Sequence, residues 1–157
     1  MPQTVAHRRG FKCKAYRNTN ADLTQAPTWA EMKSVKSVQI GDEKGEIDFG
    51  SRLSDLKLSD TGLRALTLTF PMLYLQGNAH FEAVRDAYDD DTEIELLFLT
   101  GDVGDAGEEG VNAICKIMKA PSNEELEEGK SYEFEAKPTL VMNGANPLVR
   151  TPRFVAV

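Results

Sequence analysis

Alternation of apolar and polar residues at every second position is the feature that most limits how this chain can fold. It is clearest in residues 63–70, where Leu66, Leu68 and Phe70 share one face. A period of two places successive side chains on opposite faces of a β-strand. The same pattern recurs in three other segments, at 11–17, 111–119 and 131–137. The sequence therefore predicts half-buried strands along most of its length.

Further strands are predicted where the alternation is shorter. Residues 35–40 and 46–52 are two such segments, and 92–99 is a third, with Ile94, Leu96 and Phe98 expected to face inward. About seven or eight strands result from this pattern.

A helix is predicted only at residues 79–88. Asn78 is a suitable N-cap, because its side chain can accept hydrogen bonds from the first free backbone N–H groups. The apolar residues at helical spacing are expected to pack on the strands, with Glu82, Arg85 and Asp86 outside; they are Phe81, Val84, Ala87 and Tyr88.

Strands dominate, and no strand–helix alternation repeats along the chain. This predicts a mainly β fold, an antiparallel β-sandwich or barrel with one flanking α-helix. The 157 residues suit one domain. We expect a flexible N-terminal segment at 1–10, a single β-rich domain at 11–142 and a proline-interrupted C-terminal arm at 143–157.

Residues 53–62 do not follow the alternation. Leu53, Leu56 and Leu58 stand among Ser, Asp and Lys residues, and Gly62 ends the segment. Such a segment is poor material for a core and good material for docking on a neighbouring molecule. An ordinary connection that contributes a few leucines to the core is the alternative.

Residues 101–110 hold four glycines and four acidic residues, which predicts a long flexible loop. Asp102, Asp105 and Glu108 could offer oxygen ligands to calcium, but their spacing lacks the EF-hand pattern. We therefore expect a solvated loop without a metal.

No catalytic constellation is apparent in the sequence. The two histidines, His7 and His80, form no metal-binding pair, and no nucleophile or phosphate-binding motif occurs. Glu93 and Glu95 resemble a paired carboxylate site, but an outward, solvated strand face explains them equally. The two cysteines, Cys13 and Cys115, are expected to be reduced core residues. The sequence predicts no enzyme, no cofactor and no metal site.

Charge and hydropathy limit the partners. The formal net charge of −7 opposes tight non-specific binding to nucleic acid, although it permits a channel through which nucleic acid slides. The N-terminus lacks the apolar region of a signal peptide, and the longest apolar run, 96–99, is too short to span a bilayer. We expect an intracellular protein with no membrane span.

The order of these segments resembles the major tail proteins of long-tailed bacteriophages, which form the tail tube. Trp29 precedes VKSVQI, EIDFGSR and the leucine-bearing segment, which ends in DTGLRALTLTF. The helix FEAVRDAY and the strand TEIELLFLTGD follow. The glycine-rich loop then leads into GVNAICKIMKA, and EEGKSYEFEAKPTL closes the pattern. The resemblance covers roughly residues 29–140 and consists of element order and local character.

This resemblance implies a structural role in the virion tail. In that family subunits form hexameric rings, rings stack into a tube assembled in the host cytoplasm, and DNA passes through the lumen without tight binding. Partners would be further copies of the chain and other tail proteins. For such an assembly we expect two segments to form the contacts between subunits, the leucine-bearing segment and the glycine-rich loop. The expected interface residues are Leu53, Leu56, Leu58, Gly62, Asp102, Asp105 and Glu108.

Two alternatives stay open. One is another virion or secretion structural protein, such as a tail terminator, a head–tail connector or a secretion-tube subunit. The other is a β-sandwich module that binds a ligand such as carbohydrate, although Trp29 is the only tryptophan and most other aromatic residues fall in core positions.

Overall fold

The computed structural model describes residues 14–35, 37–49, 58–125, 129–148 and 153–156. The strands are β1 (Lys14–Asn18), β2 (Trp29–Glu31), β3 (Gln39–Phe49), β4 (Leu58–Leu73), β5 (Ile94–Leu99), β6 (Glu109–Lys119), β7 (Ser122–Glu125), β8 (Gly129–Pro138), β9 (Met142–Asn143), β10 (Asn146–Pro147) and β11 (Arg153–Val155). The helix is α1 (Ala79–Asp89). In this part of the chain no helix is long and apolar enough to cross a bilayer.

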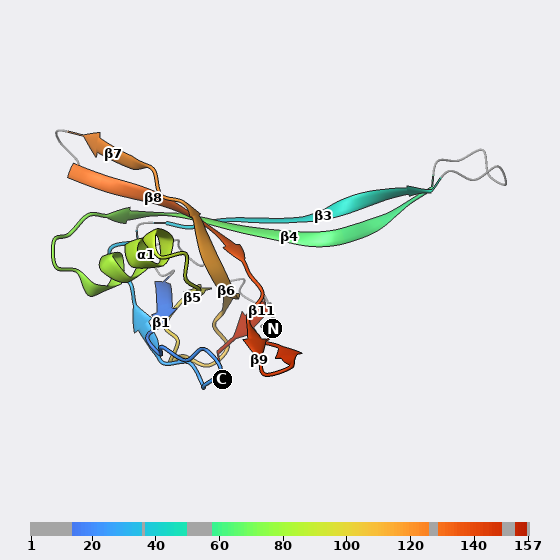
Figure 1. Ribbon diagram of the computed structural model, residues 1–157, viewed down its shortest axis with the longest axis horizontal. Coiled ribbons are helices and arrows are strands. Elements are labelled where there is room, and N and C mark those ends of the chain that lie inside the picture. The colour runs from blue at the N-terminus through green and yellow to red at the C-terminus, as the bar shows by residue number, and fades with distance from the viewer. Residues whose placement is uncertain (1–13, 36, 50–57, 126–128, 149–152, 157) are drawn as a thin grey trace, which may run out of the picture.

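One antiparallel sheet forms the body of the molecule (Figure 1). Its strands lie in the order β2-β1-β5-β6-β8-β4-β3, with β11 added beside β6 and β7 beside β8. The sheet curls into a half-barrel, and α1 packs on its concave side against the core. Strands β9 and β10 form a separate two-stranded hairpin. The predicted mainly β fold with one helix is thus confirmed.

The main core fills the concave face of the sheet. Alternation in β4, β6 and β8 delivers buried residues to this face, as the sequence predicted. Aromatic rings meet at its centre, where Phe70 lies 5.8 Å from Phe134 and Phe81 lies 6.0 Å from Phe134 between ring centroids. The core therefore joins the helix to the strands through a continuous cluster of rings.

The helix begins as predicted. The side chain of Asn78 accepts hydrogen bonds from the backbone N–H groups of His80 and Phe81. Phe81, Val84 and Ala87 are buried, but Tyr88 is 43% exposed, so its predicted burial is wrong. Tyr88 has nearly the same angular position as Phe81. It lies in the last turn, however, where the core no longer covers the helix.

Strand β5 is buried on both faces, whereas the sequence predicted one inward face. Its second face belongs to a smaller cluster in which Leu97 and Leu99 pack with Tyr16, covered by Trp29, Val103 and Phe154. Strand β11 and the 101–108 loop supply part of this cover. The alternation within β5 could not indicate this cover, because β11 lies far along the chain and the loop is mostly glycine and acidic residues.

The region of residues 35–70 differs most from the prediction. A single strand, β3, replaces the two expected at 35–40 and 46–52. Strand β4 begins at Leu58 and runs through Gly62, so half of the predicted arm at 53–62 is strand. Residues 53–57 lie outside the described residues, as do 1–10. The expected C-terminal arm contains the β9–β10 hairpin and β11, which pairs with β6.

Candidate assembly surfaces

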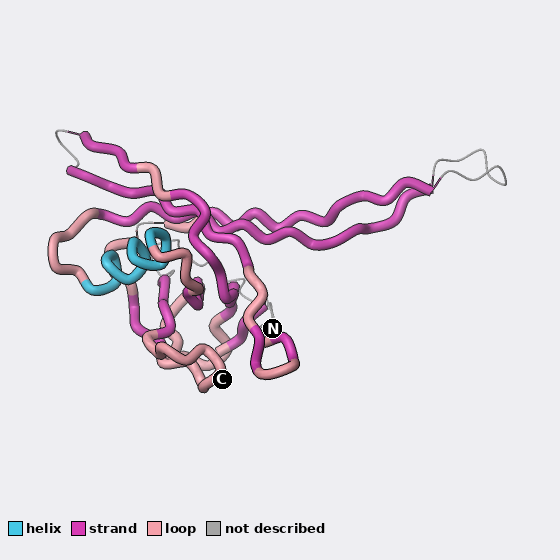
Figure 2. The backbone as a smooth tube through the Cα atoms, viewed as in Figure 1, coloured by secondary structure: helices cyan, strands magenta, loops and turns pink. Residues whose placement is uncertain are grey.

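A long hairpin of β3 and β4 extends from the body with no other element beside it (Figure 2). Every residue of β3 from Gln39 to Glu46 is exposed, as are Arg64 and Ala65 opposite them. Strand β3 is also the last strand of the sheet, so its outer backbone edge has no partner in the described chain. A two-stranded ribbon without a covering layer is only marginally stable in water.

An ion pair and a bulge shape the hairpin. Arg64 donates two hydrogen bonds to the carboxylate of Asp42, one of them 2.6 Å from Nε to Oδ1. This contact lowers the pKa of Asp42 and is solvated, so it adds little stability. Lys44 pairs with Arg64 and Glu46 with Thr61, so two residues of β4 oppose one of β3 at a bulge. Gly62 lies in this bulge, a frequent place for glycine.

The predicted interface leucines are only partly described. Leu53 and Leu56 lie outside the described residues. Leu58 begins β4, and the strand register pairs it with Phe49. The next register pair of the same face joins Ile47 and Asp60. These two register pairs thus contain three apolar residue types, Ile47, Phe49 and Leu58.

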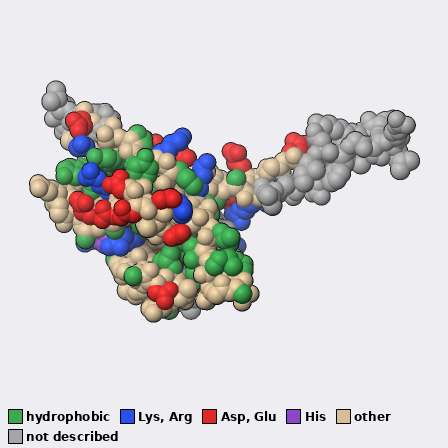
Figure 3. All heavy atoms as spheres, in the orientation of Figure 1, with side chains coloured by type: hydrophobic (Ala, Val, Ile, Leu, Met, Phe, Trp, Pro, Cys, Tyr) green, Lys and Arg blue, Asp and Glu red, His purple; other side chains and the backbone are tan. Residues whose placement is uncertain are grey.

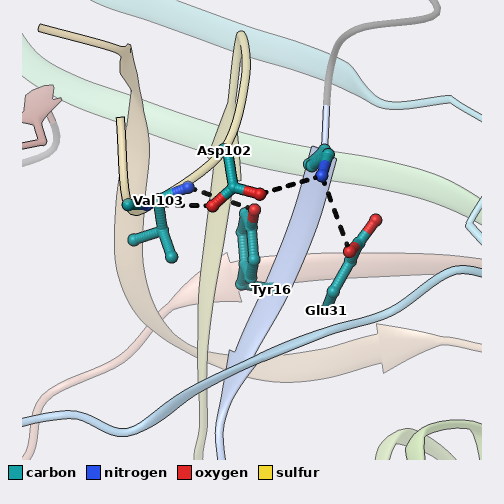
Figure 4. A network of polar contacts seen from close by, with 6 residues as sticks. Tyr16, Glu31, Asp102 and Val103 are labelled. Carbon is teal, nitrogen blue, oxygen red and sulfur yellow. Dashed lines mark hydrogen bonds and ion pairs between the residues drawn. The ribbon is translucent and has the colours of Figure 1, made fainter. Parts of the chain in front are cut away.

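The glycine-rich loop is anchored to β1 by Asp102 (Figure 4). One oxygen of Asp102 accepts the backbone N–H of Gly104 at 2.9 Å, and the other contacts Lys14 Nζ at 3.1 Å. The backbone hydrogen bond from Gly104 and the contact with Lys14 both lower the pKa of the Asp102 carboxyl. The hydroxyl of Tyr16 accepts the N–H of Val103 at 3.1 Å. Burial raises the pKa of Tyr16 and keeps it protonated.

The loop is also tied to the C-terminal segment. Gly107 N–H donates to the Ala156 carbonyl at 2.9 Å, and Ala156 N–H donates to the Glu108 carbonyl at 2.8 Å. The Glu108 side chain accepts the hydroxyl of Thr100. Asp102 and Glu108 are therefore engaged within the subunit, while Asp105 is exposed. The loop is better anchored than its glycine content indicated.

Strand β5 carries a polar cluster that the sequence did not indicate. Glu95 is fully buried and accepts a hydrogen bond from Asn18 Nδ2 at 2.9 Å, so its predicted position on a solvated face is wrong. Arg17 Nε donates to His80 Nδ1 at 2.9 Å. His80 is half-buried, and burial together with Arg17 lowers its pKa. A buried acid within a run of leucines, as in 94–99, is the signal that could have indicated a partner such as Asn18.

Two expectations from the sequence bear on the described residues, a chain without a metal site and reduced cysteines in the core. No group of three or more His, Cys, Asp or Glu side chains is placed there to hold a metal ion. Cys115 is a buried free thiol whose pKa rises to about 12, mainly through burial. Such a thiol is protonated and inert at neutral pH. Cys13 lies outside the described residues.

An apolar groove lies at the base of the hairpin, between β4, β6 and the segment that follows β8. It encloses about 410 Å³ and is lined mainly by carbon atoms, from side chains that include Leu66, Ile114, Leu140 and Leu148. Figure 3 shows apolar side chains gathered on this part of the body, below the hairpin. Leu140 is 69% exposed and Met142 is 49% exposed. Exposed apolar residues collected beside a groove are typical of an interaction surface.

The comparisons with known proteins agree with the fold. No protein-family model matches the chain, and no curated protein matches it in sequence. The tail tube of SPP1 superposes with a TM-score of 0.66 at 12% identity, covering 82% of this chain and 74% of that one. A chain of the C6-symmetric tail of an empty gene transfer agent particle superposes with a TM-score of 0.63 at 15% identity, covering 85% and 95%. A chain of the native gene transfer agent virion gives 0.61 at 14% identity, covering 85% and 95%. The chain therefore has the fold of tail tube proteins.

Proposed function

We propose that this chain is a structural subunit of a phage tail tube. Copies assemble into stacked rings, and the rings form a conduit for DNA. Six subunits per ring is the number that fits best, because a chain of the same fold stands in a C6-symmetric tail. The role is structural and not enzymatic, and the protein is located in the virion tail after assembly in the host cytoplasm.

The exposed hairpin is the observation that carries this proposal. Residues 39–46 are exposed, the outer edge of β3 has no partner among the described strands, and the outer edge of β4 has none opposite residues 41–44. Exposed strand edges are templates for pairing with another chain, and monomeric proteins usually protect them. A hairpin of this length is therefore best explained by a neighbouring subunit that covers it.

The negative charge suits a conduit for DNA. Six copies at −7 each carry a formal charge of about −42 per ring. Phosphate contacts with Lys and Arg supply most non-specific affinity for DNA, and a net negative tube provides few of them. DNA would then pass through the lumen without adhering. Further copies of the chain and other tail proteins are the expected partners.

Electron microscopy of the purified protein tests the proposal. Concentrated protein should form rings or tubes in negative stain, with a mass in solution that is a multiple of the subunit. A matched control replaces residues 44–64 by Asn-Gly, a favoured two-residue turn that joins the paired residues Glu43 and Ala65. This variant should keep the melting temperature of the body and lose assembly. A parent protein that stays monomeric at every concentration would contradict the proposal.

A further inference from the structure

The short β9–β10 hairpin turns at an Asn-Gly dipeptide (Figure 1). Asn143 pairs with Asn146, so Gly144 and Ala145 form a two-residue turn between them. Gly144 has a φ of +64°, in the left-handed region that the first residue of such a turn requires. The sequence contains this Asn-Gly pair once, and both of its residues are exposed. The dipeptide therefore lies in a turn that solvent reaches freely.

An asparagine followed by glycine can lose its side-chain amide without an enzyme. The backbone nitrogen of Gly144 attacks Cγ of Asn143 and gives up its proton to water, and the amide nitrogen leaves as ammonia. The product is a cyclic succinimide. Water then opens this ring at one carbonyl to give aspartate, or at the other to give isoaspartate, whose main chain runs through the side-chain carbons. Glycine favours the first step because no Cβ hinders the approach of its nitrogen.

The β9–β10 hairpin offers little resistance to this rearrangement. Its two strands form a sheet of their own with two residue pairs, separate from the main sheet. A lone two-stranded hairpin is only marginally stable in water, so Asn143 can leave its strand conformation. Open space surrounds the turn, since a Cβ built on Gly144 meets no atom within 4 Å. The chain can therefore bend until the Gly144 nitrogen reaches Cγ of Asn143.

Three asparagines of the body are fixed by the fold. Asn18 is buried, and its Nδ2 donates to Glu95. Asn78 Oδ1 accepts two backbone N–H groups at the start of α1. Asn112 is 7% exposed within β6. Each of the three is followed by threonine or alanine, whose Cβ hinders attack by the next nitrogen. These residues should therefore keep their amides far longer than Asn143.

The remaining asparagines lack the glycine that makes Asn143 reactive. Asn20 is exposed, but alanine follows it and its Nδ2 donates to the Ala26 carbonyl at 2.7 Å. Asn123 precedes a glutamate. Asn146 lies in the same hairpin as Asn143, but it precedes Pro147, whose nitrogen carries no proton. Asn146 is thus an internal control with the same exposed surroundings.

We propose that Asn143 is a site of spontaneous modification, at which loss of the amide gives aspartate and isoaspartate in the folded protein. This inference does not depend on the proposed tube. The change adds one negative charge to the formal −7. Isoaspartate also lengthens the main chain by one atom, which breaks the pairing of residue 143 with Asn146. Pro147 and Leu148 line the apolar groove, so the groove then loses the strand that positions part of its wall.

Peptide mapping by mass spectrometry tests the site in the full-length protein. The parent is incubated in mildly alkaline buffer, where the Gly144 nitrogen loses its proton more readily. The peptide containing Asn143 should gain the mass difference between an amide and an acid before any other asparagine does, and an isoaspartate methyltransferase should label it. The urea-denatured parent is the control for detection.

Asn143→Gln is the matched control for the chemistry. It keeps an exposed amide at the same position, but its longer side chain would have to close a larger ring, so it should stay unmodified. Retention of the Asn143 amide in the folded parent overturns the proposal, whatever the denatured chain does. Earlier loss of the amide at Asn20 or Asn146, or equal labelling of Asn143→Gln, overturns it as well.

Hydrogen exchange tests the consequence for the β9–β10 hairpin. Leu148 N–H donates to the Val141 carbonyl at 2.7 Å, so its exchange reports on the pairing. In the isoaspartate form, separated by chromatography, this N–H should exchange about tenfold faster than in the parent. Asn143→Asp is the control, because it carries the same charge on an unaltered main chain, and it should exchange like the parent. Equal exchange in the isoaspartate form would overturn the predicted opening of the hairpin.

Discussion

A single glycine fixes the closest approach between two central strands. A Cβ added at Gly110 would lie 1.7 Å from the carbonyl oxygen of Phe98, so the backbone itself would have to move. Gly110→Ala should lower the free energy of unfolding by about 1–3 kcal/mol or more, measured by urea denaturation. Gly41→Ala is the control, because its Cβ would make ordinary contacts at 3.7 Å. Equal stability of the two variants would show that β5 and β6 can separate without cost.

His80 makes stability depend on pH. Its pKa is lowered in the folded state by burial and by Arg17, so the unfolded chain binds the proton more readily. Stability from this site is complete above the ordinary histidine pKa of about 6.5 and is lost as the pH falls through the lower folded value. The melting temperature should therefore drop as the pH is lowered from 7 toward 5. His80→Gln, whose amide oxygen can still accept from Arg17, should reduce this drop.

His7→Gln is the matched control for the pH profile. His7 is the other histidine of the chain and lies outside the described residues. Its replacement should leave the profile unchanged. If the parent and His80→Gln lose the same number of degrees between pH 7 and pH 5, the acid sensitivity comes from carboxylates instead.

At the level of elements, the helix α1 holds the concave core together. Phe81 is fully buried and makes edge-to-face contacts with Tyr74 and Tyr132 at 5.2 and 5.1 Å between centroids. Phe81→Ala should cost about 3–5 kcal/mol, enough to threaten a domain of ordinary stability. Tyr88 lies seven residues further along the same face of the helix. Tyr88→Ala should cost about 1 kcal/mol or less because the ring is exposed. Calorimetry of the two variants would contradict the assigned face if their order were reversed.

Strands with one buried face could be predicted from the sequence, and the others could not. Strand β4 from Leu66 to Met72 shows clear alternation because one side meets the core and the other does not. Strand β5 is covered on both sides, so a continuous apolar run hides its second face. Strand β3 has no described burial at residues 39–46, and the pattern predicted strands only at its two ends, within 35–40 and 46–52. The residue pattern follows burial, so it is least informative where a strand is buried on both faces or on neither.

The candidate surfaces, like the strands, could be predicted only in part. Leucines among polar residues indicated a segment unsuited to the core, and Leu58 does lie on the projecting hairpin. The apolar groove could not be predicted, because Leu66, Asn112 and Leu140 come from segments far apart in the sequence that meet only in the folded sheet. The buried pair of Glu95 and Asn18 was missed for the same reason, since 77 positions separate them in the chain.

On the scale of the whole molecule, the body and the hairpin have different sources of stability. The body joins strands from both ends of the chain, so β1, β5, β6 and β11 depend on one another. In the proposed tube the hairpin gains its stability from a neighbour, because a bare ribbon has little apolar surface to bury within its own subunit. Changes at the end of the hairpin should therefore act on assembly and spare the fold.

Replacing Leu53, Leu56 and Leu58 together by Ser tests this separation. The monomer should melt at the temperature of the parent, because the proposed function places these leucines at the contact between subunits. Tube formation, followed by electron microscopy, should be abolished. Each leucine buried at an interface contributes roughly 1.5–3 kcal/mol, and a ring of stacked subunits loses that contribution at every contact.

Ser59→Ala is the control for this triple variant, since it changes the same strand without removing an apolar side chain. It should assemble like the parent. Unfolding of the triple variant would place the leucines in the core of the subunit. Normal assembly would show that the hairpin end is not the contact, and the argument from its apolar residues to a tube would then fail.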